Sequence, residues 1–430
     1  MSTPNASETT STEQLSTSAP TKRKRGGRIG MGIAIALIVI VLLAGLAGGY
    51  FLNAYLTKSS APVQITETGS TLLYPLMNIW GPNYTAFNSH VTLSTLGTGS
   101  GAGQSGAETG TYNIGASDAY VANFTQTSII NVPVAISAQL VYYNLPGVTG
   151  HLNLNGTVLA MIYNQTITTW ANPLILNAQS STVQGELKAL PSNAQTIVLL
   201  KRADSSGDTF LFTSLCYQSW NGFGYLPKTS GFSGLATKGS STVIPETGNS
   251  GMVTGIEGQP GGIAYIGISY QKSVTGANVN YAAIGDNLAL SASGGVNPSN
   301  YILPSAQNIS EDANLGLTNL NFTSYGLAIS LILGGVKDTL VTANDYGNGG
   351  TNPTATYSTP YPIVNLEYSL IKTSPVGNTV TSSSLAATVM FLEWAIGQGN
   401  QPVYLNQVGF VPLTTTVLGY DMIELGQVSV

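Results

Sequence analysis

The stretch Ile197-Val-Leu-Leu-Lys-Arg-Ala-Asp-Ser-Ser-Gly-Asp-Thr-Phe210 joins a predicted strand to a predicted helix. Its apolar start, Ile197–Leu200, is typical of a buried strand, and the spacing in Leu211–Tyr217 suits a short helix. A strand-to-helix turn capped at or near Ser206 directs backbone N–H groups and the positive end of the helix dipole at one spot. The stretch therefore predicts an α/β unit that can hold an anion.

The side chains of this turn fit the same chemistry. Arg202 offers a fork of donors suited to a planar or tetrahedral oxyanion. Asp204 is expected to restrain Arg202, and Asp208 places a carboxylate beside the anion site. Three hydroxyl groups that can donate accompany them, those of Ser205, Ser206 and Thr209. We interpret the turn as half of an oxyanion pocket, although a polar turn that only caps a helix would use the same residue types.

The pattern of strand, small or polar turn, and helix recurs before this stretch, with turns at Thr71 and Ser100. A third short strand ends at Asp118. In open α/β sheets, ligands bind beyond the carboxyl ends of the strands, so these turns are expected to face one cleft. Gly101–Gly106 fits G-x-G-x-x-G, but it lacks the acidic residue and the Lys-Ser/Thr pair of nucleotide sites. A plain flexible loop is the alternative there.

Composition narrows the function. The net charge of -5 argues against nucleic acid as a partner, and 430 residues suffice for two domains. Charged residues make up 8% of the chain, against roughly 25% in an average soluble protein, so the surface must consist mainly of neutral polar groups. Because such a surface changes little when carboxylates are protonated, we expect an acidic medium outside the cell and no sharp loss of stability near pH 4. The single cysteine, Cys216, and two distant histidines, His90 and His151, predict no disulfide, metal site, cofactor or catalytic triad.

The N-terminal part reads as a membrane anchor. Residues 1–28 are expected to form a disordered, basic cytoplasmic tail, and 29–52 an apolar transmembrane helix, close to the ~20 residues that span a bilayer. The basic residues before this helix then place the rest outside the cell, as a single-pass membrane protein. Cleavage near residues 44–47 is the alternative. Six N-x-S/T sequons predict a glycoprotein, at Asn83, Asn123, Asn155, Asn164, Asn308 and Asn321.

Over residues 62–415 the chain resembles the substrate-binding proteins of phosphate-specific ABC importers. The resemblance rests on collinear motifs, Gly69-Ser-Thr-Leu72, Gly97-Thr-Gly-Ser-Gly101, Gly115-Ala-Ser-Asp118, Arg202–Phe210, Gly248-Asn-Ser-Gly-Met252, Gly262–Gly267, Tyr361-Pro-Ile363 and Val408–Leu413. It implies a periplasmic-binding-protein-like fold of type II, with two α/β lobes around a cleft. The implied crossings fall near 132–136 and 361–364, which gives lobe one as 62–134 plus 364–430 and lobe two as 135–363.

The resemblance also implies the phosphate contacts. In lobe one they are the Thr71 hydroxyl, the backbone of Leu72, Ser100 and Asp118, and in lobe two Arg202, Ser206, Gly207 and Asp208. Two positions depart from the family pattern, since Leu72 replaces a residue that is often aromatic and Asp208 stands where a hydroxyl residue is common.

The acidic residues suggest how phosphate is told from sulfate. A buried carboxylate accepts a hydrogen bond only from an oxyanion that still carries a proton, and it faces sulfate as an unpaired like charge. Asp118 is expected to play this part, and Asp208 to accept a second proton, which would favour monobasic phosphate. If Asp208→Thr leaves the pH profile of binding unchanged, that role for Asp208 is wrong.

The sequence leaves three alternative functions for this protein. The first is a membrane-tethered phosphate receptor, without catalytic residues, that hands the anion to the permease subunits of an ABC importer. The second is an extracellular phosphate-ester hydrolase, which the scarcity of histidines and acids disfavours. The third is a structural or adhesive surface protein that kept the lobes but lost the ligand. Phosphate affinity separates the first from the third, and turnover of a phosphate ester identifies the second.

Overall fold

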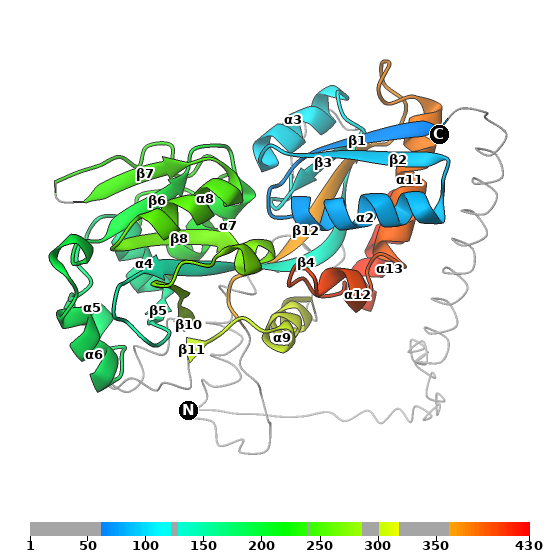
Figure 1. The fold of residues 1–430 in the computed structure, drawn as a ribbon. Coiled ribbons are helices and arrows are strands. Elements are labelled where there is room, and N and C mark those ends of the chain that lie inside the picture. The colour runs from blue at the N-terminus through cyan, green and yellow to red at the C-terminus, as the bar shows by residue number, and fades with distance from the viewer. Residues whose placement is uncertain (1–61, 122–127, 240, 286–300, 318–360) are drawn as a thin grey trace, which may run out of the picture. The chain divides into compact units, whose positions relative to one another are not determined.

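The computed structural model describes residues 62–121, 128–239, 241–285, 301–317 and 361–430, which form a mixed α/β fold (Figure 1). Its main sheet has the strand order β2-β1-β3-β12-β4-β8-β6-β7, with β9 also paired to β4. A smaller sheet has the order β11-β10-β5. The strands are β1 (Val63–Gly69), β2 (Val91–Gly97), β3 (Ile114–Ser117), β4 (Ile129–Asn144), β5 (Asn153–Asn155), β6 (Val198–Arg202), β7 (Thr242–Glu246), β8 (Gly262–Gly267), β9 (Val279–Tyr281), β10 (Ala283–Gly285), β11 (Tyr301–Ile302) and β12 (Val364–Lys372).

The long strand β4 is shared by two groups of strands. Up to Ala138, which lies opposite Val364, it pairs antiparallel with β12. From Gln139, which lies opposite Gly267, it pairs antiparallel with β8. Strands β1, β2 and β3 run parallel on one side, and β6, β7 and β8 on the other. The described residues therefore form two α/β lobes joined through β4 (Figure 1).

Helices follow the strands of both lobes, as the alternation in the sequence predicts. They are α2 (Tyr74–Phe87), α3 (Ser100–Thr109), α4 (Gly156–Tyr163), α5 (Pro173–Leu176), α6 (Ser181–Lys188), α7 (Gly207–Ser219), α8 (Gly248–Gly258), α9 (Ala306–Leu317), α11 (Ser382–Ile396), α12 (Pro402–Leu405) and α13 (Thr415–Leu425). Polar residues cap the N-termini of several helices, because a side-chain oxygen can accept a hydrogen bond from a first-turn N–H. Thr381 and Ser384 form a capping box at α11, and Asn155 caps α4.

The apolar core contains large aromatic side chains from helices α2 and α11. Trp80 is buried, and its Nε1 donates to the carbonyl of Gly399 at 2.9 Å. Trp394 is also buried and packs against Phe391. Both side chains belong to the core.

Several expectations concern parts of the chain that the structure does not describe. The tail at 1–28 and the anchor at 29–52 lie outside the described residues. Within the ranges given above, no helix is long and apolar enough to cross a membrane.

One sequon is incompatible with the fold. Asn155 is buried, and its side chain accepts from the backbone N–H of Val158 as the cap of α4. A glycan on this nitrogen would have to occupy the protein interior, so the expected glycosylation of Asn155 is wrong. Asn123 and Asn321 lie outside the described residues.

Candidate oxyanion-binding site

Arg202 is held rigidly at the end of β6. Its guanidinium is buried and donates through Nε and Nη2 to the carboxylate of Asp204, the Nε bond to Oδ1 measuring 2.8 Å. Nη1 donates to Oδ2 of Asp208 at 2.8 Å. The expectation that Asp204 restrains Arg202 is confirmed. Since each terminal nitrogen of a guanidinium carries two N–H groups, one N–H on Nη1 and one on Nη2 are outside these three bonds.

The start of α7 lies next to this arginine. The helix begins at Gly207, earlier than the apolar spacing indicates, because Ser206 caps it and accepts from the N–H of Thr209 at 3.4 Å. First-turn N–H groups, here those of Gly207 and Asp208, have no acceptor within a helix. A Cβ on Gly207 would lie 2.4 Å from side-chain atoms of Asp118. Only glycine therefore allows this helix end to approach Asp118.

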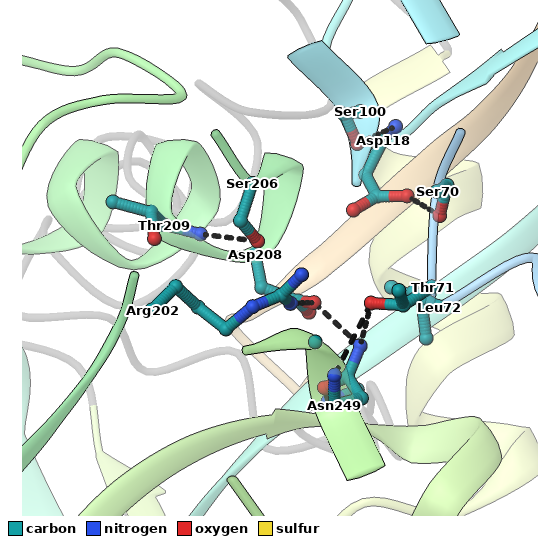
Figure 2. A network of polar contacts seen from close by, with 12 residues as sticks. Ser70, Thr71, Leu72, Ser100, Asp118, Arg202, Ser206, Asp208, Thr209 and Asn249 are labelled. Atoms are coloured by element: carbon teal, nitrogen blue, oxygen red, sulfur yellow. Dashed lines mark hydrogen bonds and ion pairs between the residues drawn. The ribbon is translucent and has the colours of Figure 1, made fainter. Parts of the chain in front are cut away.

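Asp118 follows β3 in lobe one and is 1% exposed. Its backbone N–H donates to Oγ of Ser100 at 3.2 Å, and its Oδ1 accepts from the hydroxyl of Ser70 (Figure 2). Ser100 is the first residue of α3, so two turns of lobe one meet at this carboxylate. The oxygen of Ser70 also accepts from the N–H of Leu73 at 2.9 Å, which fixes the hydroxyl in place.

Asn249, in the first turn of α8, connects the residues of the two lobes (Figure 2). Its Nδ2 donates to Oγ1 of Thr71 at 3.0 Å and to Oδ2 of Asp208 at 2.7 Å. Its Oδ1 accepts from the N–H of Gly267 at 2.9 Å. A second contact between the two groups of residues is the bond from the N–H of Gly101 to the carbonyl of Ser205, at 2.9 Å.

These contacts involve seven of the eight residues that the resemblance implies as phosphate contacts. They bring together Thr71, Ser100, Asp118, Arg202, Ser206, Gly207 and Asp208. Leu72 follows Thr71, but its side chain is fully buried against Gly267, where an added Cβ would come within 2.3 Å of Cδ1. Its carbonyl accepts from Oγ of Ser269 at 2.7 Å. The leucine side chain therefore serves packing against β8.

Comparison with known protein families identifies the fold. A family model described as a PBP superfamily domain matches residues 56–397. The chain belongs to this superfamily.

Two curated relatives match this chain over most of its length. The phosphate-binding protein PstS of Xylella fastidiosa is 25% identical over 370 residues, which cover 84% of each chain. The phosphate-binding protein PstS of Methanocaldococcus jannaschii is 24% identical over 414 residues, or 93% of this chain and 96% of the relative. The solved phosphate-binding protein from Stenotrophomonas maltophilia has a TM-score of 0.54 and 19% identity, covering 84% of this chain and 93% of that structure, a likeness of fold.

Sequence reasoning missed four polar residues of the site. Ser70 and Asn249 lie inside motifs quoted for the resemblance, but neither was assigned a contact. Gln139 donates through Nε2 to the carbonyl of Asp208 at 2.9 Å and to its Oδ1 at 3.2 Å. Glu367 lies beside Asp118. These four residues contact site residues on other segments of the chain, so no local sequence pattern identifies them.

Burial dominates the electrostatics of the acids. It raises the pKa of Asp208 to about 7, with a further rise from the charge of Asp118 and an opposing effect of Arg202. Burial also raises the pKa of Asp118, against hydrogen bonds from Glu367 and Ser70. At Asp204, burial is outweighed by the hydrogen bonds and charge of Arg202, which hold the pKa of that carboxyl below its usual value. Burial therefore favours the protonated forms of Asp208 and Asp118, and the charge of Arg202 opposes it at both residues.

The two histidines take no part in these contacts. His151 contacts the carbonyl oxygen of Tyr281 through Nδ1 at 2.7 Å, and His90 precedes β2. Among the residues that the structure describes, no group of three or more His, Cys, Asp and Glu side chains could hold a metal ion. The site is thus built from hydroxyl, amide, guanidinium and carboxyl groups.

Replacing Asn249 is expected to destabilise the protein. Asn249→Ala removes the partner of Thr71, Asp208 and the Gly267 N–H at once, in a place that is 0% exposed. Leaving buried polar groups unsatisfied costs about 1–3 kcal/mol each, so a loss of at least about 2 kcal/mol is expected in urea unfolding. Asn78→Ala is the matched control, since Asn78 is exposed and its Nδ2 only donates to the carbonyl of Tyr74. Equal effects of the two variants would contradict this role.

Proposed function

We propose that the protein is an extracellular receptor that binds inorganic phosphate and delivers it to an ABC importer. The observation that carries the proposal is the convergence of a buried arginine, three hydroxyl groups and a carboxylate from two lobes, in a chain whose relatives are named phosphate-binding proteins. Contacts from both lobes to one anion would shift an open–closed equilibrium toward the closed form.

The hydroxyl groups are oriented to donate. Oγ1 of Thr71 accepts from Asn249, Oγ of Ser100 from the N–H of Asp118, and Oγ of Ser206 from the N–H of Thr209. In each of these bonds the oxygen is the acceptor, so the hydrogens of Thr71 and Ser206 are available to an oxyanion. The Ser100 hydroxyl also hydrogen-bonds the Asp118 carboxylate, so it would have to turn from Asp118 to the anion. With the outer N–H groups of Arg202 and the first-turn N–H groups of Gly207 and Asp208, these donors suit a tetrahedral oxyanion. The backbone of Leu72 is proposed to donate as well.

Asp118 supplies selectivity in this proposal. As an ionised carboxylate it accepts the proton that phosphate carries near neutral pH, whereas sulfate has none to give. The described contacts of Asp208 are with Arg202, Asn249 and Gln139. We therefore propose that Asp208 mainly orients Arg202, and its acceptance of a second phosphate proton stays a prediction.

Calorimetry on the full chain tests the proposal. The protein, purified in detergent and stripped of bound anion by partial unfolding and refolding, is titrated with phosphate and then with sulfate at pH 7. Saturable heat with phosphate and none with sulfate is expected. No heat with either anion contradicts the phosphate receptor and leaves the structural or adhesive function. Release of phosphate from an ester such as a nitrophenyl phosphate would identify the hydrolase instead.

The proposal includes the lobe boundaries and the anchor. Lobe one would comprise 62–134 with 364–430 and lobe two 135–363, in the type II arrangement. Residues 29–52 would cross the membrane, with the lobes outside the cell and the basic tail in the cytoplasm. The full chain should sediment with membranes after carbonate extraction, and a variant lacking residues 1–52 should not. A full chain that is released by carbonate contradicts the anchor.

A further inference from the structure

Glu367 is a buried acid that lies behind the candidate site. It is on β12 opposite Ala135, at a bulge where the register with β4 shifts between Glu367 and Tyr368. The side chain is 0% exposed. Its Oε1 accepts from Oγ of Ser137 at 2.5 Å and from Nδ2 of Asn365 at 3.4 Å. Its Oε2 is buried and has no hydrogen-bond partner from a donor group among the described residues.

The neighbour of this carboxyl is the carboxyl of Asp118. The two side chains are within hydrogen-bonding reach of each other, and Nδ2 of Asn365 links the two residues by also donating to the carbonyl of Asp118 at 2.6 Å. Two adjacent buried carboxylates cannot both be ionised without a large electrostatic cost. A proton between them removes that cost and gives Oε2 of Glu367 a partner.

We propose that Glu367 keeps a proton near neutral pH and donates it to Asp118, so that Asp118 stays ionised as the acceptor of the site. Glu367 is then a positioning residue, which acts on the anion through Asp118. This inference rests on the proposed function for its consequence in binding, although the protonation of Glu367 can be measured without any ligand.

The surroundings decide which of the two acids holds the proton. Asp118 receives the hydroxyl hydrogen of Ser70 and feels the positive charge of Arg202, and both favour its ionised form. Burial, followed by the charge of Asp118, raises the pKa of Glu367 well above its usual value, and Asp208 adds to the rise. In a protonated carboxyl one oxygen accepts and the other donates. Oε1 of Glu367 takes both donated bonds, which leaves Oε2 to carry the hydrogen.

The arrangement matters for selectivity. If Asp118 lost its donor, it would be a buried carboxylate with fewer hydrogen bonds and would take up a proton more readily. A protonated Asp118 could donate to fully ionised sulfate and would no longer repel it. The proton on Glu367 thus keeps the site closed to anions that have no proton.

Two variants of Glu367 separate donation from shape. Glu367→Gln keeps a donor at the position of Oε2, through its amide nitrogen, and Glu367→Met keeps the volume without a donor. The infrared spectrum of the ligand-free full chain should show protonated-carboxyl C=O absorption at pH 7, and Glu367→Gln should remove the part of this absorption that Glu367 contributes. Glu367→Gln should bind phosphate within about threefold of the unmodified chain and still exclude sulfate, whereas Glu367→Met should lose at least about tenfold in phosphate affinity and in the phosphate-to-sulfate ratio.

The outcomes are distinct. An unchanged C=O band in Glu367→Gln would show that Glu367 is ionised and would overturn the inference. So would a Gln variant that fails like the Met variant, or a Met variant with unmodified affinity and selectivity. A chain that binds no phosphate at all would overturn the proposed function, while the infrared result would still decide where the proton lies. Thermal melts of both variants show whether each is folded.

Discussion

Arg202→Ala is expected to abolish phosphate binding, with a loss in affinity of at least about 100-fold. Two N–H groups of this arginine are outside its bonds with Asp204 and Asp208, and hydrogen bonds to charged groups are worth about 1.5–3 kcal/mol each. Losing two of them removes about 3–6 kcal/mol, and about 1.4 kcal/mol corresponds to a factor of ten. Calorimetric titration of the full chain with phosphate at pH 7 measures the loss.

The alanine variant also leaves two carboxylates without their cation. Asp208 is 0% exposed, and breaking a buried ion pair from one side destabilises a protein by about 3–5 kcal/mol. Arg202→Lys distinguishes a folding defect from a binding defect, because it keeps a positive charge but loses the planar fork. We expect the lysine variant to melt closer to the unmodified chain and still bind phosphate at least about tenfold more weakly.

Lys188→Ala is the control for charge alone. Lys188 is exposed in the last turn of α6, and its removal changes the net charge as Arg202→Ala does. It should leave phosphate affinity unchanged. Undiminished binding by both arginine variants would mean that the anion site lies elsewhere.

The local parts of the site were predictable from the sequence. The strand Ile197–Leu200, the cap at Ser206 and the pairing of Arg202 with Asp204 depend on neighbours a few residues away, and short-range pattern reading captures such relations. The structure has β6 at Val198–Arg202 and α7 beginning at Gly207. The hydroxyl turns of lobe one were found in the same way, because the alternation of strand and helix is itself local.

The polar connections between distant segments were not predictable. Asn249 contacts Thr71, 178 residues away in the sequence, and Gln139 contacts Asp208, 69 residues away. Nothing in the spacing of these residues indicates such pairs, since the sheet order brings them together. The extent of β4 was missed for a related reason: all of its 16 residues are buried, so it lacks the polar alternation that marks a half-exposed strand.

The stability of the protein is expected to fall as the pH rises from about 4.5 to about 8. Glu67, on β1, is 1% exposed, and burial raises its pKa from 4.5 to about 8, against a hydrogen bond from Thr95. The folded chain then binds more protons than the unfolded chain between these two pH values, so the contribution is present in acid and is lost as the pH rises. Burial likewise raises the pKa of Asp208 and of Glu393 to about 7.

The expected loss at Glu67 alone is a few kcal/mol, because each unit of pKa difference corresponds to about 1.4 kcal/mol. Urea unfolding at several pH values between 4 and 8 measures it. Glu67→Gln should flatten the decline, since a neutral amide cannot titrate. Glu257→Gln provides a control: backbone hydrogen bonds from Thr275 and Gly276 lower the pKa of Glu257, so its contribution to stability changes only in more acidic solution, and its loss should leave the slope of the decline toward pH 8 unchanged.

This direction is the reverse of ordinary acid denaturation, in which carboxylates that are stabilised in the native state must be protonated. The composition makes the reversal observable, because with only 19 Asp and Glu residues in 430 a few buried acids carry much of the proton linkage. A chain that unfolds sharply on acidification to pH 4 would contradict both the direction at Glu67 and the acidic exterior inferred from the low charge. If stability instead declines toward neutral pH and Glu67→Gln reduces this decline, then the protonated acids of the core contribute to the tolerance of acid. The low charge of the surface and the protonated core would then both favour stability at acidic pH.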